Sequence, residues 1–133
     1  MRILVVGGGG REHAICWKLN NESNVEKIYC APGNAGISSV AKCIDIQDSD
    51  IENLLKFAKE NQIDLTIVGP EIPLVAGIVD AFEKEGLKIF GPNKECAQLE
   101  GSKAFSKDFM IRHNLPTAKY KEYTNLDEAI SEI

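Results

Sequence analysis

Four consecutive glycines, at residues 7–10, follow the short apolar segment Ile-Leu-Val-Val at residues 3–6. Such an apolar, β-branched run is typical of a strand buried on both faces of a parallel sheet. The residues from about Arg11 to Asn20 can form a helix, whose N-terminal amides favour an anion, most often phosphate. Because glycine has no Cβ, the intervening loop lets backbone N–H groups approach a ligand closely. The segment predicts a first βα unit with a phosphate-binding loop; the structural alternative is a simple tight turn.

Composition narrows the class of protein. At 133 residues, with 44% hydrophobic and 26% charged residues, the chain has room for one globular α/β domain and the start of another. Its net charge of −5 disfavours general nucleic-acid binding, which normally needs a basic surface. No apolar run reaches the length of a membrane span, and polar residues follow the first apolar segment too soon for a signal peptide. We therefore expect a cytoplasmic protein with small-molecule partners and no nucleic-acid or membrane partner.

Cysteine and histidine spacing gives no reason to expect a metal site. The four cysteines are widely separated and never form a CxxC pair, so neither zinc nor a disulfide framework is expected. The two histidines, His13 and His113, lack the helical spacing of metal-binding pairs.

Strand-like and helix-like segments alternate along the first 100 residues. Strands are expected at about residues 2–6, 25–30, 43–46, 64–68 and 87–90, and helices at about residues 11–20, 51–61, 73–85 and 94–99. Ser49 and Glu52 match a capping box at the start of the second helix, and Gly86 suits the end of the third. Such alternation implies right-handed crossovers. It predicts a Rossmann-like open parallel sheet of about five strands in the order 3-2-1-4-5, with helices on both faces.

In a sheet of that order the chain reverses direction between strands one and four, and ligands bind at such a switch point. The glycine- and proline-containing loops at residues 7–11, 32–36 and 69–74 would converge there. Glu71 would then suit a ligand hydroxyl or amine. The candidate substrate-binding residues are Gly8, Gly9, Gly10, Arg11, Glu12, Gly33, Asn34, Gly69, Pro70 and Glu71.

A dinucleotide cofactor is not expected at this site. The glycines do not fit G-x-G-x-x-G, because Glu12 or His13 stands where the third glycine belongs. The second strand also ends in Tyr-Cys-Ala-Pro, without the carboxylate that binds ribose hydroxyls in dinucleotide-binding folds. We predict that the chain binds neither NAD nor FAD.

The pattern changes near residue 101. A new helix starts within residues 99–110, residues 118–123 could form a strand, and residues 124–127 cap another helix. No sixth strand continues the first sheet. We therefore expect a first domain at residues 1–100 and a second domain that begins at about residue 101 and extends beyond residue 133.

Four motifs in order carry a family resemblance. They are Gly-Gly-Gly-Arg-Glu-His-Ala at residues 8–14, Pro-Gly-Asn-Ala-Gly at 32–36, Gly-Pro-Glu at 69–71 and Leu-Glu-Gly-Ser-Lys-Ala-Phe at 99–105. Together they resemble the N-terminal part of the glycinamide ribonucleotide synthetase (phosphoribosylamine–glycine ligase) family, of ATP-grasp architecture. One departure is Gly8, where the family often has Asn.

The resemblance implies a ligase of de novo purine biosynthesis. ATP with Mg²⁺ (or Mn²⁺) would activate the carboxylate of glycine as an acyl phosphate. Attack by the amine of 5-phosphoribosylamine would then give glycinamide ribonucleotide, ADP and phosphate. Residues 1–100 would contribute to the phosphoribosyl site and residues from about 101 would begin the ATP-grasp domain. Lys103 is the candidate nucleotide-phosphate contact.

The same resemblance places the metal ligands and most of the nucleotide site after residue 133. No catalytic residue is therefore assigned within this chain, and the chain alone should be inactive. Two other interpretations stay open. One is a stand-alone nucleotide or sugar-phosphate-binding module, and the other is the matching domain of another ATP-grasp carboxylate–amine ligase. The Gly-Arg-Glu-His-Ala and Leu-Glu-Gly-Ser-Lys stretches favour the glycine ligase.

Overall fold

The computed structural model describes residues 1–132 of the chain. The chain divides into two compact units, Met1–Ala97 and Gln98–Ile133. Each unit is described separately below.

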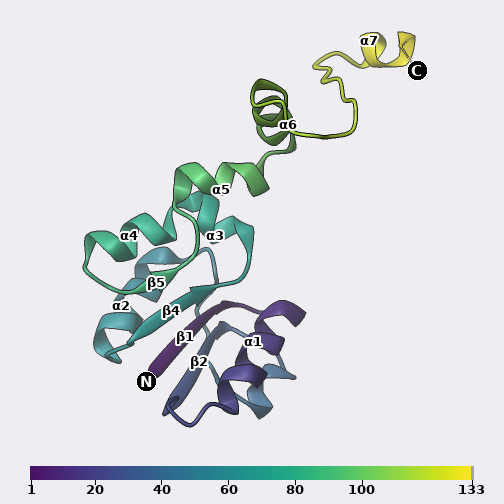
Figure 1. Ribbon diagram of the computed structural model, residues 1–133. Helices are drawn as coiled ribbons and strands as arrows, with labels where there is room; N and C mark the ends of the chain where they lie inside the picture. The colour runs from purple at the N-terminus through teal and green to yellow at the C-terminus, as the bar shows by residue number, and fades with distance from the viewer. Residues whose placement is uncertain (133) are drawn as a thin grey trace. The chain divides into compact units, whose positions relative to one another are not determined.

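The first unit contains a five-stranded parallel sheet (Figure 1). Its strands are β1 (Arg2–Gly7), β2 (Lys27–Pro32), β3 (Lys42–Cys43), β4 (Leu65–Val68) and β5 (Ile89–Phe90). The order is β3-β2-β1-β4-β5, and every neighbouring pair is parallel. In the centre, Val5 lies opposite Cys30 on one side and Ile67 on the other. The predicted α/β class and strand order are confirmed.

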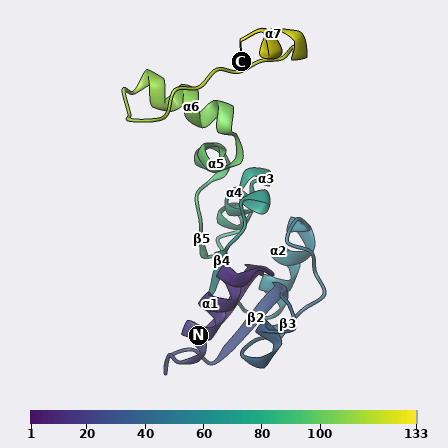
Figure 2. The ribbon, with the colours of Figure 1, turned by 90° about the vertical axis from the view of Figure 1, so that its right-hand side faces the viewer.

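Helices cover both faces of this sheet, as predicted. They are α1 (Gly10–Asn20), a 3₁₀ turn at Ile37–Ser39, α2 (Ile51–Glu60), α3 (Glu71–Ala76) and α4 (Ile78–Lys84); α5 (Lys94–Gly101) begins in this unit and ends in the second. In two perpendicular views, α1 and α2 lie on opposite sides of the strands (Figures 1 and 2).

Strand β1 supplies residues to two apolar clusters in alternation, because successive side chains point to opposite faces. Ile3 and Val5 pack with Cys16 of α1, while Leu4 and Val6 pack in the other cluster with Leu54 of α2. All four β1 side chains are almost completely buried. Strand β1 is therefore the centre of the fold. The glycine run lies at its carboxyl end.

Some predicted elements differ in detail. The third strand is only two residues long, and Asp50 rather than Ser49 caps α2, accepting a hydrogen bond from the Asn53 N–H group at 3.2 Å. The single helix predicted over residues 73–85 is two helices, because Gly77 adopts φ +97° and ends α3. A left-handed residue stops a helix, and glycine takes that conformation at little cost.

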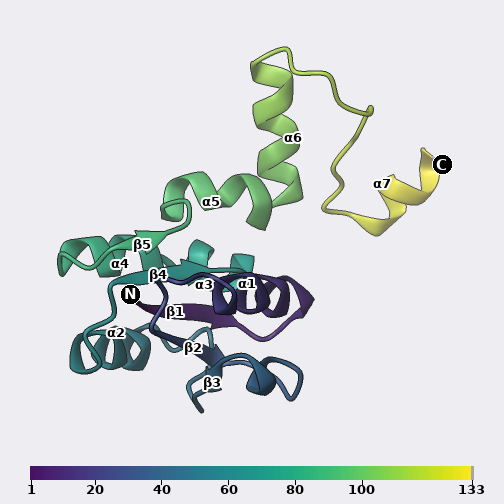
Figure 3. The same ribbon diagram turned by 60° about the horizontal axis from the view of Figure 1, so that its bottom comes forward.

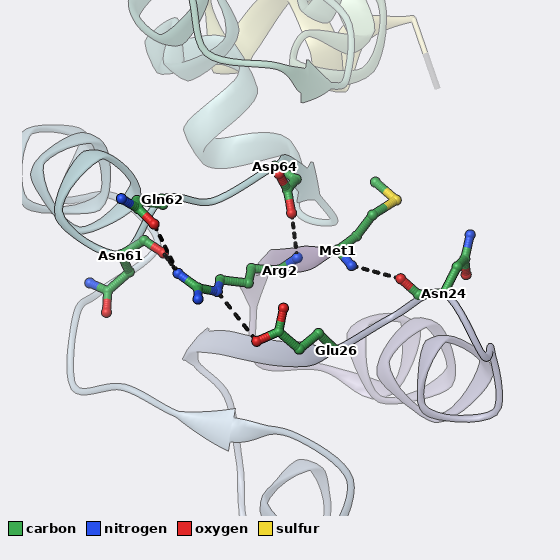
Figure 4. Close-up of polar contacts among 7 residues, drawn as sticks. All are labelled: Met1, Arg2, Asn24, Glu26, Asn61, Gln62 and Asp64. Atoms are coloured by element: carbon green, nitrogen blue, oxygen red, sulfur yellow. Dashed lines mark hydrogen bonds and ion pairs between the residues drawn. The ribbon is translucent and has the colours of Figure 1, made fainter.

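The amino ends of the strands are held by polar contacts of the first two residues (Figure 4). The backbone N–H group of Arg2 donates to Asp64 at 2.6 Å, and its guanidinium donates to Gln62 at 3.2 Å and lies 3.7 Å from Glu26. The N-terminal amine donates to the Asn24 carbonyl at 2.6 Å. These contacts join β1 to the segments before β2 and β4, at the opposite end of the strands from the glycine run.

The second unit contains α6 (Lys103–Arg112) and α7 (Leu126–Ser131), joined by an irregular segment that Figure 3 shows in full. The strand predicted at residues 118–123 is wrong. A strand needs a partner for its backbone groups, and the described part of this unit contains no other strand. Side chains hold the segment instead: the Lys107 ammonium donates to the Thr117 hydroxyl at 2.6 Å and to the Ala118 carbonyl at 3.2 Å.

None of the helices described over residues 1–132 has both the length and the apolar character that a membrane crossing requires.

Candidate functional site

A hollow of about 510 Å³ lies at the carboxyl ends of β1 and β4. This is the edge at which ligands bind in open α/β sheets. Most of the predicted substrate-binding residues line the hollow, whereas Gly33, Asn34 and Gly69 do not. The lining residues are Gly8, Gly9, Gly10, Arg11, Glu12, Asp48, Pro70 and Glu71.

The first turn of α1 supplies hydrogen-bond donors to this hollow. The first backbone bond of the helix runs from the His13 N–H group to the Gly9 carbonyl at 3.1 Å. The N–H groups of Gly10, Arg11 and Glu12 come before it and have no partner within the helix, as at every helix start. They are oriented with the positive end of the helix dipole, so they suit an anion.

The Gly9 N–H group is already occupied. It donates to Glu12 Oε2 at 2.6 Å, which is one half of a capping box with glycine at the N-cap. Glu12 is only 4% exposed, although it is charged and lies beside the hollow. Its carboxylate faces the backbone of the loop.

Two glycines make room for the Glu12 side chain. A Cβ atom on Gly69 would lie 1.8 Å from Glu12 Oε1, and one on Gly7 would lie 2.8 Å from Glu12 Cδ. Gly7 also has φ +121°, which disfavours any side chain there. Close packing against Glu12 therefore requires glycine at two of the predicted loop positions.

Arg11 also contacts the loop after β4. Its guanidinium donates a hydrogen bond to the Gly69 carbonyl, so two successive α1 residues, Arg11 and Glu12, both contact Gly69. A guanidinium has five N–H donors, and Arg11 is exposed at the hollow. It can therefore hold the loop and still donate to a ligand.

The loop after β2 packs behind the glycine run. The Gly33 N–H group donates to the Gly7 carbonyl at 3.2 Å, and Asn34 Nδ2 donates to the Gly8 carbonyl at 2.8 Å. Asn34 Oδ1 accepts from the Ile37 N–H group at 2.9 Å. A Cβ on Gly8 would lie 2.7 Å from the Gly33 carbonyl oxygen. The side-chain amide of Asn34 thus joins two of the three predicted loops.

Buried thiols lie under these loops. Cys30 Sγ donates to the Gly7 carbonyl at 3.3 Å. The neighbouring Cys16 thiol, together with burial, raises the pKa of the Cys30 thiol far above its ordinary value. A protonated, buried thiol is unreactive.

Over residues 1–132 no group of three or more His, Cys, Asp or Glu side chains is placed to hold a metal ion.

Two carboxylates at the hollow are free of partners in the described structure. Neither the side chain of Glu71, at the start of α3, nor that of Asp48 has a hydrogen bond or ion pair with any residue from 1 to 132. Glu71 is one of the predicted site residues, but Asp48 is not. Asp48 comes from the polar loop before α2, and no motif in that stretch signals a site.

The second unit holds the predicted nucleotide contact. Lys103 is exposed at the first position of α6, and its ammonium has no partner among residues 1–132. Lys107, one turn further on, is bonded to Thr117 and Ala118. Of the two lysines, Lys103 is therefore the one available to a ligand.

Comparisons with known proteins identify the family of this chain. Residues 1–100 match the family model described as phosphoribosylglycinamide synthetase, N domain. The phosphoribosylamine–glycine ligase of Caldanaerobacter subterraneus is 58% identical over 130 residues, which is 98% of this chain and 31% of that protein. The chain thus spans less than a third of the length of this relative.

Solved structures show the same fold. The crystal structure of phosphoribosylamine–glycine ligase from Thermotoga maritima superposes with a TM-score of 0.71 at 30% identity, over 99% of this chain and 30% of that one. N5-carboxyaminoimidazole ribonucleotide synthetase from the same organism superposes with a TM-score of 0.67 at 22% identity, over 98% and 36%. The second likeness concerns the fold alone. The match over residues 1–100 shows that this chain belongs to the phosphoribosylglycinamide synthetase family, as its N domain.

Proposed function

We propose that this chain is the N-terminal part of an ATP-dependent phosphoribosylamine–glycine ligase. In this proposal the hollow beside α1 binds the phosphoribosyl group of 5-phosphoribosylamine. The observation that carries the proposal is the free first turn of α1, which opens into a hollow between two glycine loops. The identity to the Caldanaerobacter ligase favours this member of the superfamily over a stand-alone binding module.

The 5-phosphate would bind at the N–H groups of Gly10 and Arg11, with the Arg11 guanidinium as a further donor. Charge-assisted bonds of this kind are stronger than neutral ones. Gly9 would let the phosphate approach the backbone, since it has no side chain, and Gly8 would let the loop after β2 pack behind the site. Because the donors are local, the net charge of −5 does not oppose binding.

The ribose would lie toward the loop after β4. The free carboxylate of Glu71 would accept hydrogen bonds from ribose hydroxyls or from the amine, because a carboxylate repels the phosphate. Gly69 and Pro70 would shape this side of the site. Gly33 and Asn34 would contribute by holding the glycine loop, through their bonds to Gly7 and Gly8.

ATP would be bound mainly by parts of the enzyme after residue 133, with Lys103 as a contact from this chain. ATP would supply the phosphoryl group that activates the carboxylate of glycine, and a metal ion would neutralise its phosphates. The residues that the structure describes do not fit a metal site, and no catalytic step is assigned to them. The second unit would be the start of the ATP-grasp domain, and the enzyme would work in the cytoplasm.

A chimaera tests this function. This chain would replace the matching residues of the Caldanaerobacter ligase. We expect ADP release that requires both glycine and 5-phosphoribosylamine, at a rate ordinary for enzymes, about 1 s⁻¹ or more. The 133-residue chain alone should release none. A folded chimaera that hydrolyses ATP without any dependence on 5-phosphoribosylamine would contradict the proposal.

A further inference from the structure

We propose that Glu12 is a positioning residue of this site: its buried carboxylate sets the shape of the glycine loop and joins it to the loop after β4. The identity of the ligand in this inference rests on the proposed function. The structural role of Glu12 does not depend on that ligand and is tested separately below.

Glu12 differs from the residues proposed to contact the ligand in its burial and in the direction of its carboxylate. Its side chain is 4% exposed, whereas Arg11 and Glu71, which line the same hollow, are exposed. One carboxylate oxygen accepts the Gly9 N–H group at 2.6 Å. The other lies where a side chain of Gly69 would stand. Both oxygens therefore face protein backbone.

The bond to Gly9 decides which amides a ligand meets. With the Gly9 N–H group bonded to Glu12, the backbone amides left at the start of α1 are those of Gly10, Arg11 and Glu12. Without Glu12, the Gly9 N–H group would lose its acceptor and the loop would gain freedom. An anion would then have to order the loop as it binds, which weakens affinity.

The Glu12 side chain also packs against both the loop after β1 and the loop after β4. Its side chain fills the space between Gly7, at the end of β1, and Gly69, in the loop after β4. Arg11 bonds the same Gly69 from outside. Glutamine has the same length and can accept the Gly9 N–H group, but aspartate is one methylene shorter and alanine has no acceptor.

The charge of Glu12 is not needed for this role. A carboxylate beside a bound phosphate is repulsive, so a neutral side chain of the same shape should bind phosphate as well or better. A direct contact of the carboxylate with a ligand hydroxyl predicts the opposite, because bonds to a charged acceptor are stronger. Glu12→Gln therefore separates positioning from direct contact.

The experiment uses NMR on the 133-residue chain and needs two measurements. The first is hydrogen exchange of the Gly9 amide without ligand. The second is the Kd of ribose 5-phosphate. Glu12→Gln, Glu12→Ala and a control, Glu52→Ala, would be compared with the unaltered chain. Glu52 is also an acidic residue in the first turn of a helix, but it is exposed and lies on α2.

We expect Glu12→Ala to expose the Gly9 amide to exchange and to raise the Kd about tenfold or more. Glu12→Gln should keep the protection and leave the Kd equal or lower, and Glu52→Ala should change neither. An unchanged Gly9 amide in Glu12→Ala, or a Kd raised equally by Gln and Ala, overturns the positioning role. If the unaltered chain does not bind ribose 5-phosphate, the proposed function fails, and the exchange result alone decides the structural role of Glu12.

Discussion

Glu12 Oε1 occupies the place in which a side chain of Gly69 would begin, 1.8 Å from the ideal Cβ position. Glu12 lies in the first turn of α1, after β1, and Gly69 lies in the loop after β4, so the two residues stand on either side of the switch point. The glycine of the Gly-Pro-Glu motif is thus explained by a side chain from a different motif. This packing relates the two loops and gives a direct prediction.

Gly69→Ala should lower the free energy of unfolding by about 1–3 kcal/mol, because overpacking a closed site forces side chains and backbone to shift. Gly10→Ala is the matched control, since nothing lies within 4 Å of a Cβ there. That change, at the first position of α1, should be neutral or slightly stabilising. Urea unfolding of both variants checks the prediction, and equal stabilities would contradict the packing argument.

The two lysines of α6 should differ in function. Lys103→Ala should raise the KM for ATP in the chimaera roughly tenfold or more, because it would remove a charged donor to a nucleotide phosphate. Lys107→Ala should leave that KM nearly unchanged and loosen the segment that it holds at Thr117 and Ala118. Steady-state kinetics at varied ATP concentration measures the first effect. An unchanged KM and kcat in Lys103→Ala would reject its role.

Tyr120 gives a pH-dependent signal in the second unit. Its hydroxyl donates to the Asp108 carboxylate, and this bond raises the pKa of Tyr120 to about 12. Since the folded pKa is above the usual value near 10, the stabilising effect is complete below about pH 10 and is lost as the pH rises through 12. Absorbance titration of tyrosinate should show this late step, and Tyr120→Phe identifies it. In Asp108→Asn the step should move back toward pH 10; a step that does not move would contradict the assigned bond.

The fold was predictable from sequence because its signals are local and repeated. The apolar run at residues 3–6 is central in the sheet and buried on both faces, as such a run predicts. The alternation of strands and helices predicted a doubly wound parallel sheet, and 3-2-1-4-5 is the common strand order of the Rossmann-like class. The break at Gly77 was harder to predict, because an isolated glycine in a helical pattern does not reveal whether it adopts a positive φ.

The site was predictable as a group of loops, but not in the role of each side chain. Glu12 does not signal its burial in the sequence, because the usual capping box has Ser or Thr at the N-cap and this one has Gly9. Asn34 bonds to Gly8, and Asp48 reaches the hollow, through contacts distant in sequence. Such contacts follow from tertiary structure, and no local pattern contains them. The strand expected at residues 118–123 failed for the same reason, since pairing depends on another segment.

The central claim is that the hollow beside α1 binds a ribose phosphate through the first-turn amides. A titration of the ¹⁵N-labelled 133-residue chain with ribose 5-phosphate tests it most directly. Gly9→Val serves as the variant: the extended backbone at Gly9 accepts valine, but its side chain would block the approach of the phosphate and crowd Glu12 Oε2, 3.0 Å from the Cβ position. We predict that the amide signals of residues 7–11 shift in the unaltered chain and stay unmoved in Gly9→Val, whose other signals remain those of the folded protein. Shifts confined to a distant surface, with residues 7–11 unmoved, would contradict the claim.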